Sequence, residues 1–120
     1  MTEPTIEFPE GYFDRREDET PSKGWLDVVV HFRLQRYRVS FYDATRARQS
    51  LEDQVQMGHV HFAEPGFVLL TEVNTANVRR AVHELAREGF FDRLAPEKIV
   101  DRQVTLDSRA SPRQWAAAVN

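Results

Sequence analysis

The sequence contains no cysteine among its 120 residues. This absence excludes a disulfide-stabilised scaffold, a thiol nucleophile, a zinc site with cysteine ligands and an iron–sulfur cluster. Glycine is also scarce, with five residues that do not cluster, so no glycine-rich loop is present to bind phosphate. Any chemistry at a functional site must therefore use histidine, arginine or carboxylate side chains.

Long apolar runs and a strong excess of one charge are missing as well. No apolar run approaches the roughly 20 residues that a membrane-spanning helix needs. The first 25 residues carry acidic groups and prolines in place of the apolar stretch of an export signal. The net charge of −3 gives no general reason to expect nucleic acid as a partner. We therefore expect a cytoplasmic protein without a membrane association.

The chain divides into an N-terminal arm, residues 1–24, and a single α+β domain, residues 25–120. Prolines, glycines and a charged run interrupt the arm, and such a composition disfavours regular structure. Four apolar side chains of the arm nevertheless need a place to bury: Ile6, Phe8, Tyr12 and Phe13. We expect the early part of the arm to lie on the domain, with an edge strand near residues 6–8, and residues 15–23 to be looser.

The first half of the domain predicts two strands and a helix. Residues 25–34 and 37–42 alternate apolar and polar side chains, a period that is typical of strands. A turn at Gln35 and Arg36 would place the apolar side chains of both strands, Leu34 included, on one face. The helix that follows is predicted to begin at Asp43 and end at Gly58, with a narrow apolar stripe that packs only lightly.

The second half repeats this order. Residues 59–63 and 67–73 are predicted to pair as strands across a type II turn at Pro65 and Gly66, and a helix capped by Asn74 or Thr75 follows. These elements predict a two-layer α+β sandwich with a mostly antiparallel sheet of four to five strands. The expected core order is ββαββα, with the helices on one face. A strand at 102–107 and a short C-terminal helix anchored by Trp115 complete the prediction.

Histidines provide the first candidate site. His59 and His61 would lie on one side of the expected strand, about 6–7 Å apart along it, with Glu72 across from His59. Two histidines and a carboxylate can bind zinc or another divalent metal ion, and no other cofactor is indicated. Ordinary histidines on a polar sheet face are the simpler interpretation, because isolated His-x-His pairs are common and no other metal-site spacing is present.

Two wider alternatives use the non-core face of the sheet. A small-ligand site, or an enzyme site, would draw on six polar residues: His31, Arg33, Arg38, Tyr42, His59 and His61. Single-stranded nucleic acid would instead bind through Arg33, Arg36 and Arg38, although Tyr42 alone supplies a stacking ring.

Catalytic motifs are missing, since there is no G-x-S-x-G elbow and no phosphate-binding loop. Residues 67–70 are apolar on both faces of their strand, so a second layer must cover part of the sheet. We therefore favour a non-enzymatic protein-binding or regulatory module over an enzyme. Its partner would be another protein or a second copy of the chain in a homodimer. Four residues of the terminal segments are expected at this interface: Phe8, Tyr12, Phe13 and Trp115.

Overall fold

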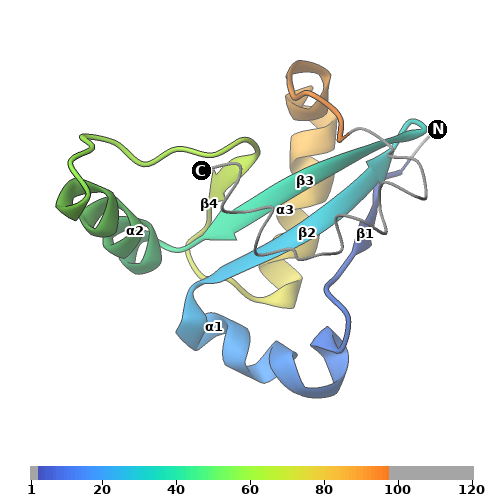
Figure 1. Ribbon diagram of the computed structural model, residues 1–120. Helices are drawn as coiled ribbons and strands as arrows, with labels where there is room; N and C mark the ends of the chain where they lie inside the picture. Colours follow the sequence, from blue (N-terminus) through green and yellow to red (C-terminus); the bar gives the residue numbers. More distant parts are fainter. Residues whose placement is uncertain (1–2, 98–120) are drawn as a thin grey trace, which may run out of the picture.

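The computed structural model describes residues 3–97. In chain order the main elements are β1 (Thr5–Glu7), α1 (Thr20–Lys23), β2 (Trp25–Phe32), β3 (Gln35–Tyr42), α2 (Ala44–Gln56), β4 (Phe67–Leu69) and α3 (Thr75–Arg87) (Figure 1). Three shorter helical turns are η1 (Tyr12–Arg16), η2 (Glu17–Glu19) and η3 (Phe90–Arg93). None of the helices in this part of the chain is long and apolar enough to cross a membrane. The predicted strand at 102–107 and helix at Trp115 lie outside the described residues.

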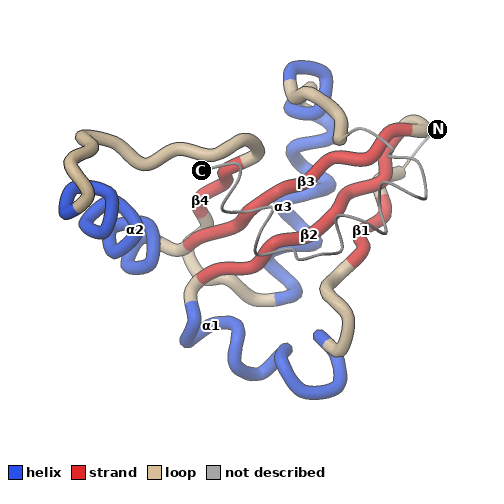
Figure 2. Tube along the Cα trace, viewed as in Figure 1, coloured by secondary structure: helices blue, strands red, loops and turns tan. Residues whose placement is uncertain are grey.

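The four strands form one sheet in the order β1-β2-β3-β4 (Figure 2). β1, β2 and β3 are antiparallel neighbours, whereas β4 pairs with β3 in parallel. The α+β class is confirmed, but the order ββαββα is wrong, because residues 59–63 form no strand and β4 has no hairpin partner. A parallel neighbour requires a crossover connection, which α2 and the loop after it supply.

The hairpin of β2 and β3 turns two residues earlier than predicted. Its turn residues are Arg33 and Leu34, with φ values of 55° and 68°, which is the conformation of a type I′ turn. Phe32 therefore pairs with Gln35. Moving the turn by two residues shifts the pairing by four, and an even shift leaves every side chain on its original face, so the apolar sides of the two strands still coincide. Leu34 is the exception, because it is fully exposed in the turn rather than packed inside.

The core lies between the sheet and α3, which runs behind β2 and β3 in Figure 1. Its fully buried members include Val30, Val39 and Phe41 from the strands and Val78 and Val82 from α3. α2 contributes no residue to this core and has no buried residue of its own. We expected both helices to cover one face of the sheet, but only α3 does so.

The N-terminal arm is more regular than its composition predicted. β1 forms the expected edge strand and pairs with residues 29–31 of β2. Residues 12–23, part of which we expected to be loose, form the helical turns η1 and η2 and the short helix α1. Gly24, with φ of 77°, ends α1 and leads directly into β2. The arm thus runs from the sheet edge, across one end of α3, and back into the sheet.

Candidate functional site

The six residues predicted to surround a ligand do not form one site. His31, Arg38 and Tyr42 lie on the sheet face opposite α3, which we call the outer face. Arg33 occupies the β2–β3 turn, and the other two residues belong to the loop after α2. Of the six, Arg38 alone lines the groove described below. The predicted ligand site is therefore divided among three parts of the molecule.

The metal-site prediction depended on a hairpin that does not form. The rings of His59 and His61 have centroids 6.2 Å apart, but both lie in the loop before β4. Glu72 is not placed across from His59, since β4 pairs with β3 instead. Among residues 3–97 there is no group of three histidine or carboxylate side chains that could hold a metal ion.

The three clustered arginines are each beside a carboxylate. Glu97 lies 3.5 Å from Arg36 and 3.2 Å from Arg38, and its backbone N–H donates to the carbonyl oxygen of Arg36 at 2.7 Å. Arg33 pairs with Asp92 at 3.0 Å. These acidic neighbours reduce the positive charge that a nucleic-acid phosphate would meet.

Tyr42 sits in an aromatic cluster on the outer face. Its ring lies 5.5 Å from Phe62 and 5.2 Å from Phe67, and its hydroxyl donates to the Glu64 carboxylate at 3.3 Å. Burial, followed by the negative charges of Glu64 and Asp27, raises the pKa of Tyr42 well above its usual range. Tyr42 is consequently a neutral donor that ties the loop before β4 to the sheet.

This raised pKa predicts a pH dependence of stability. In the unfolded chain a tyrosine ionises near pH 10, whereas folded Tyr42 keeps its proton to higher pH. The stabilising contribution of Tyr42 is therefore complete below about pH 10 and is lost as the pH rises further, by at most about 1.4 kcal/mol per pH unit. Urea unfolding of the wild type and of Tyr42→Phe at pH 8, 10 and 11 measures this contribution to the free energy of unfolding. The difference in unfolding free energy between the wild type and Tyr42→Phe should become smaller above pH 10. A difference that stays constant would contradict the raised pKa of Tyr42.

A groove lies along the half of β2 that β1 leaves uncovered, and we call it the edge groove. β1 pairs only with residues 29–31, so residues 25–28 have β3 as their sole strand partner within the described part of the chain. The N-terminal arm leaves the sheet at this point and forms the opposite wall. The cavity between them has a volume of about 370 Å³.

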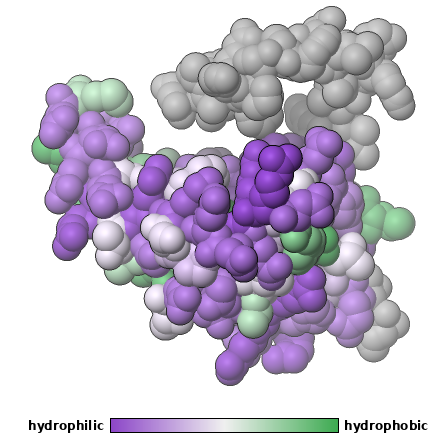
Figure 3. Space-filling model, turned by 90° about the horizontal axis from the view of Figure 1, so that it is seen from below, coloured by the Kyte–Doolittle hydropathy of each residue, from purple (hydrophilic) through white to green (hydrophobic). Residues whose placement is uncertain are grey.

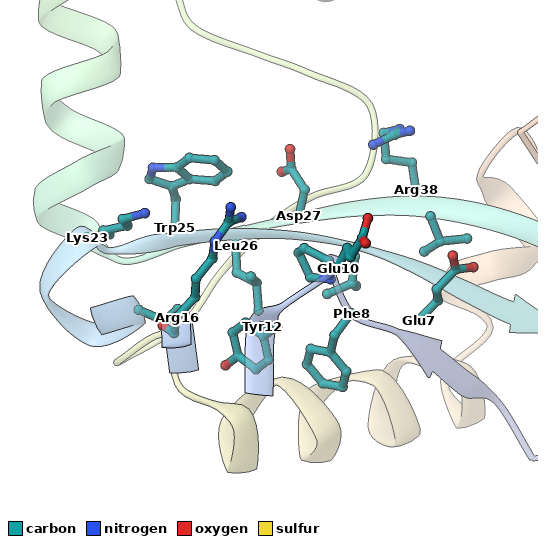
Figure 4. A pocket seen from close by; sticks show the side chains of 14 residues that line it. Glu7, Phe8, Glu10, Tyr12, Arg16, Lys23, Trp25, Leu26, Asp27 and Arg38 are labelled. Carbon is teal, nitrogen blue, oxygen red and sulfur yellow. Dashed lines mark hydrogen bonds between the residues drawn. The ribbon is translucent and has the colours of Figure 1, made fainter. Parts of the chain in front are cut away.

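The two sides of the edge groove differ in chemistry (Figure 4). Leu26, Tyr12 and Phe8 form its apolar floor on the α3 side, while Trp25 and Asp27 stand on the outer face. Its polar rim includes three cations and three carboxylates: Arg16, Lys23, Arg38, Glu7, Glu10 and Asp27. Within residues 3–97, neither of the rim cations Arg16 and Lys23 has an ion-pair partner. The groove can therefore accept an apolar group below and an anion at its rim.

No protein-family model matches this chain. A search of curated proteins and a search of solved structures likewise find no match. Function must accordingly be argued from the geometry of the chain itself.

The four residues predicted at a partner interface have different positions. Tyr12 is 1% exposed and belongs to the core, so it lines the floor of the edge groove but presents very little free surface. Phe8 stacks on it at 4.9 Å and also lines the edge groove. Phe13 is 52% exposed beside Arg79, and Trp115 lies outside the described residues.

Sequence reasoning missed the edge groove. It treated Trp25 only as the first residue of a strand and Arg16 and Lys23 as part of a loose segment. One signal was available in the sequence. The edge strand expected near residues 6–8 is much shorter than the strand expected at residues 25–34, so it could cover only part of that strand.

Proposed function

We propose that this protein is a non-enzymatic protein-binding module that takes an extended segment of a partner protein into the edge groove. The observation that carries the proposal is the uncovered stretch of β2 at residues 25–28, which forms one wall of the groove. An uncovered strand edge presents backbone donors and acceptors to an added strand, and peptide recognition by strand addition uses this chemistry.

The register of the hairpin identifies which backbone groups face the groove. A two-residue turn makes Phe32 and Gln35 a hydrogen-bonded pair, and such pairs alternate along antiparallel strands. Even-numbered residues of β2 therefore bond to β3, and the N–H and C=O groups of Trp25 and Asp27 point the other way. These four groups are available to bind the backbone of an incoming strand.

The lining favours a particular peptide chemistry. Four residues of strand span about 13 Å, so the groove accommodates a short extended segment. Side chains of that segment alternate between the two faces of the sheet. An apolar side chain would meet Phe8 and Leu26 on the α3 side. A carboxylate of that segment would pair with the rim cations Arg16 and Lys23, and this pairing would be the source of specificity.

The substitution Asp27→Pro tests this proposal. Proline removes the N–H that faces the groove and leaves the hydrogen bonds of β2 to β3 intact, because Asp27 is not one of their donors. Peptides of seven random residues are selected against the full chain, and their affinity is measured by fluorescence anisotropy. We expect Asp27→Pro to weaken binding about tenfold and the selected peptides to carry an apolar and an acidic residue.

Asp27→Ala is the matched control, because it removes the same carboxylate but keeps the N–H. It should retain most of the affinity. Amide NMR signals of residues 25–28 should shift on peptide addition in the wild type. Failure to select any peptide, equal binding by Asp27→Pro, or shifts confined to another surface would each overturn the proposal.

A further inference from the structure

α2 is a 13-residue helix without a buried residue. It stands off the end of the sheet in Figure 1, away from α3. Of the seven large hydrophobic residues that are exposed in the described part of the chain, four lie in α2 and the loop after it: Leu51, Val55, Met57 and Val60. In Figure 3 hydrophobic surface appears at the edge of this projecting part, whereas most of that view is hydrophilic. A helix of this length is marginal without tertiary packing, so its outward face requires an explanation.

The outward face has a defined composition. At 100° per residue, five of its exposed residues lie together within an arc of about 100°, and we call them the α2 stripe: Ala44, Arg48, Leu51, Glu52 and Val55. Leu51 is 39% exposed and Val55 is 54% exposed. The amino-terminal half of the stripe is small and basic, and the carboxyl-terminal half is larger and acidic. The two halves are thus complementary to each other in size and in charge.

From this complementarity we infer that the protein forms a homodimer through an antiparallel pair of α2 helices. A two-fold axis near residue 50 places Arg48 of each copy level with Glu52 of the other. The same axis brings the two Leu51 side chains together at the centre. Val55 of each copy then packs against Ala44 of the other, so that a large side chain meets a small one. Such an interface is isologous, as in most homodimers.

The charges favour a second copy in this orientation over the parallel one. A parallel pair would place Arg48 beside Arg48 and Glu52 beside Glu52, which is repulsive. Within one helix Arg48 and Glu52 are 3.9 Å apart and both largely exposed, so their intrahelical pairing is weak and does not prevent pairing across the interface. The α2 stripe shares no residue with the edge groove. The dimer therefore does not depend on the proposed function, and it would present two grooves per assembly.

The oligomeric state of the full chain tests the inference. Sedimentation equilibrium between about 5 and 500 µM covers the affinity expected of a small helix–helix interface. We expect the wild type to approach twice the chain mass. Leu51→Asp should weaken dimerisation at least tenfold, because it places two carboxylates at the apolar centre. Gln49→Asp adds the same charge on another face of α2 and should leave the dimer unchanged, with circular dichroism confirming that both variants are folded.

Charge exchange distinguishes this geometry from other dimers. Arg48→Glu alone and Glu52→Arg alone should each weaken self-association, because each brings like charges together. A mixture of these two variants should form a heterodimer, and the double variant should recover the homodimer. A wild type that stays monomeric at every concentration, or single charge variants that associate like the wild type, would overturn the inference. Neither result affects peptide binding at the edge groove.

Discussion

Gly66→Ala should lower the free energy of unfolding by about 3 kcal/mol, because backbone strain and a steric clash add together. Gly66 has φ of 71°, a conformation that disfavours any side chain. A Cβ atom at this position would collide with the carbonyl oxygen of Arg38 and lie 3.3 Å from the Cα of Val39. Both obstacles are backbone atoms of the central strand β3, so neither can move aside cheaply. The carbonyl oxygen of Gly66 also accepts a hydrogen bond from the N–H of Ser40 at 2.9 Å.

Gly58→Ala is the matched control for this prediction. Gly58 also has a positive φ, 94°, but no atom lies within 4 Å of the position that a Cβ would take. Its substitution carries the conformational cost alone, about 1 kcal/mol. Urea unfolding followed by circular dichroism measures both variants. Equal losses at the two positions would show that the close approach of Gly66 to β3 contributes nothing to stability.

The helix starts were predictable because their signals are local. The side chain of Asp43 accepts a hydrogen bond from the N–H of Arg46, and that of Asn74 accepts one from the N–H of Asn77, both at 2.8 Å. Each contact joins residues three apart and depends on residue type alone. The weak apolar pattern of α2 likewise predicted light packing, and this prediction is confirmed by the absence of buried residues in the helix.

The strand pairings were less predictable, since they depend on contacts between distant residues. Arg33 and Leu34 adopt positive φ although turns of this type favour asparagine and glycine, so no local signal marked the turn. The sequence Glu64-Pro65-Gly66-Phe67 resembles a hairpin turn, and Gly66 has the expected positive φ. The strand after it nevertheless pairs with β3, because Val68 packs against the core there.

The candidate sites show the same difference between features that local sequence determines and features that depend on contacts between distant residues. The α2 stripe can be recognised from periodicity once the helix is known to be uncovered, but periodicity cannot show that it is uncovered. The edge groove depends on where β1 stops along β2 and on the path of the N-terminal arm. Both features belong to the tertiary structure. Rim residues such as Arg16 and Lys23 form no recognisable pattern in the sequence.

The path of the arm depends on Tyr12, which was predicted to contact a partner but lies in the core. Its hydroxyl is 2.7 Å from the Thr75 hydroxyl, which in turn donates to Glu17 at 2.7 Å. Its ring stacks on Phe8 and is 1% exposed. Tyr12→Ala should therefore cost about 4 kcal/mol of unfolding free energy, through lost burial and the cavity left behind. The arm should also become sensitive to protease, since Tyr12 holds it against the start of α3.

Two further variants separate the parts of this effect. Tyr12→Phe keeps the ring and removes the hydroxyl contact, so its expected cost is about 1 kcal/mol. Phe13→Ala removes the neighbouring aromatic ring, which is 52% exposed, and should cost less than about 1.5 kcal/mol. Urea unfolding and limited proteolysis of the full chain measure all three. If Phe13→Ala destabilised the protein as much as Tyr12→Ala, the arm would be held by its exposed surface rather than by Tyr12. The position of the arm, which forms one wall of the edge groove, would then depend on Phe13 as well.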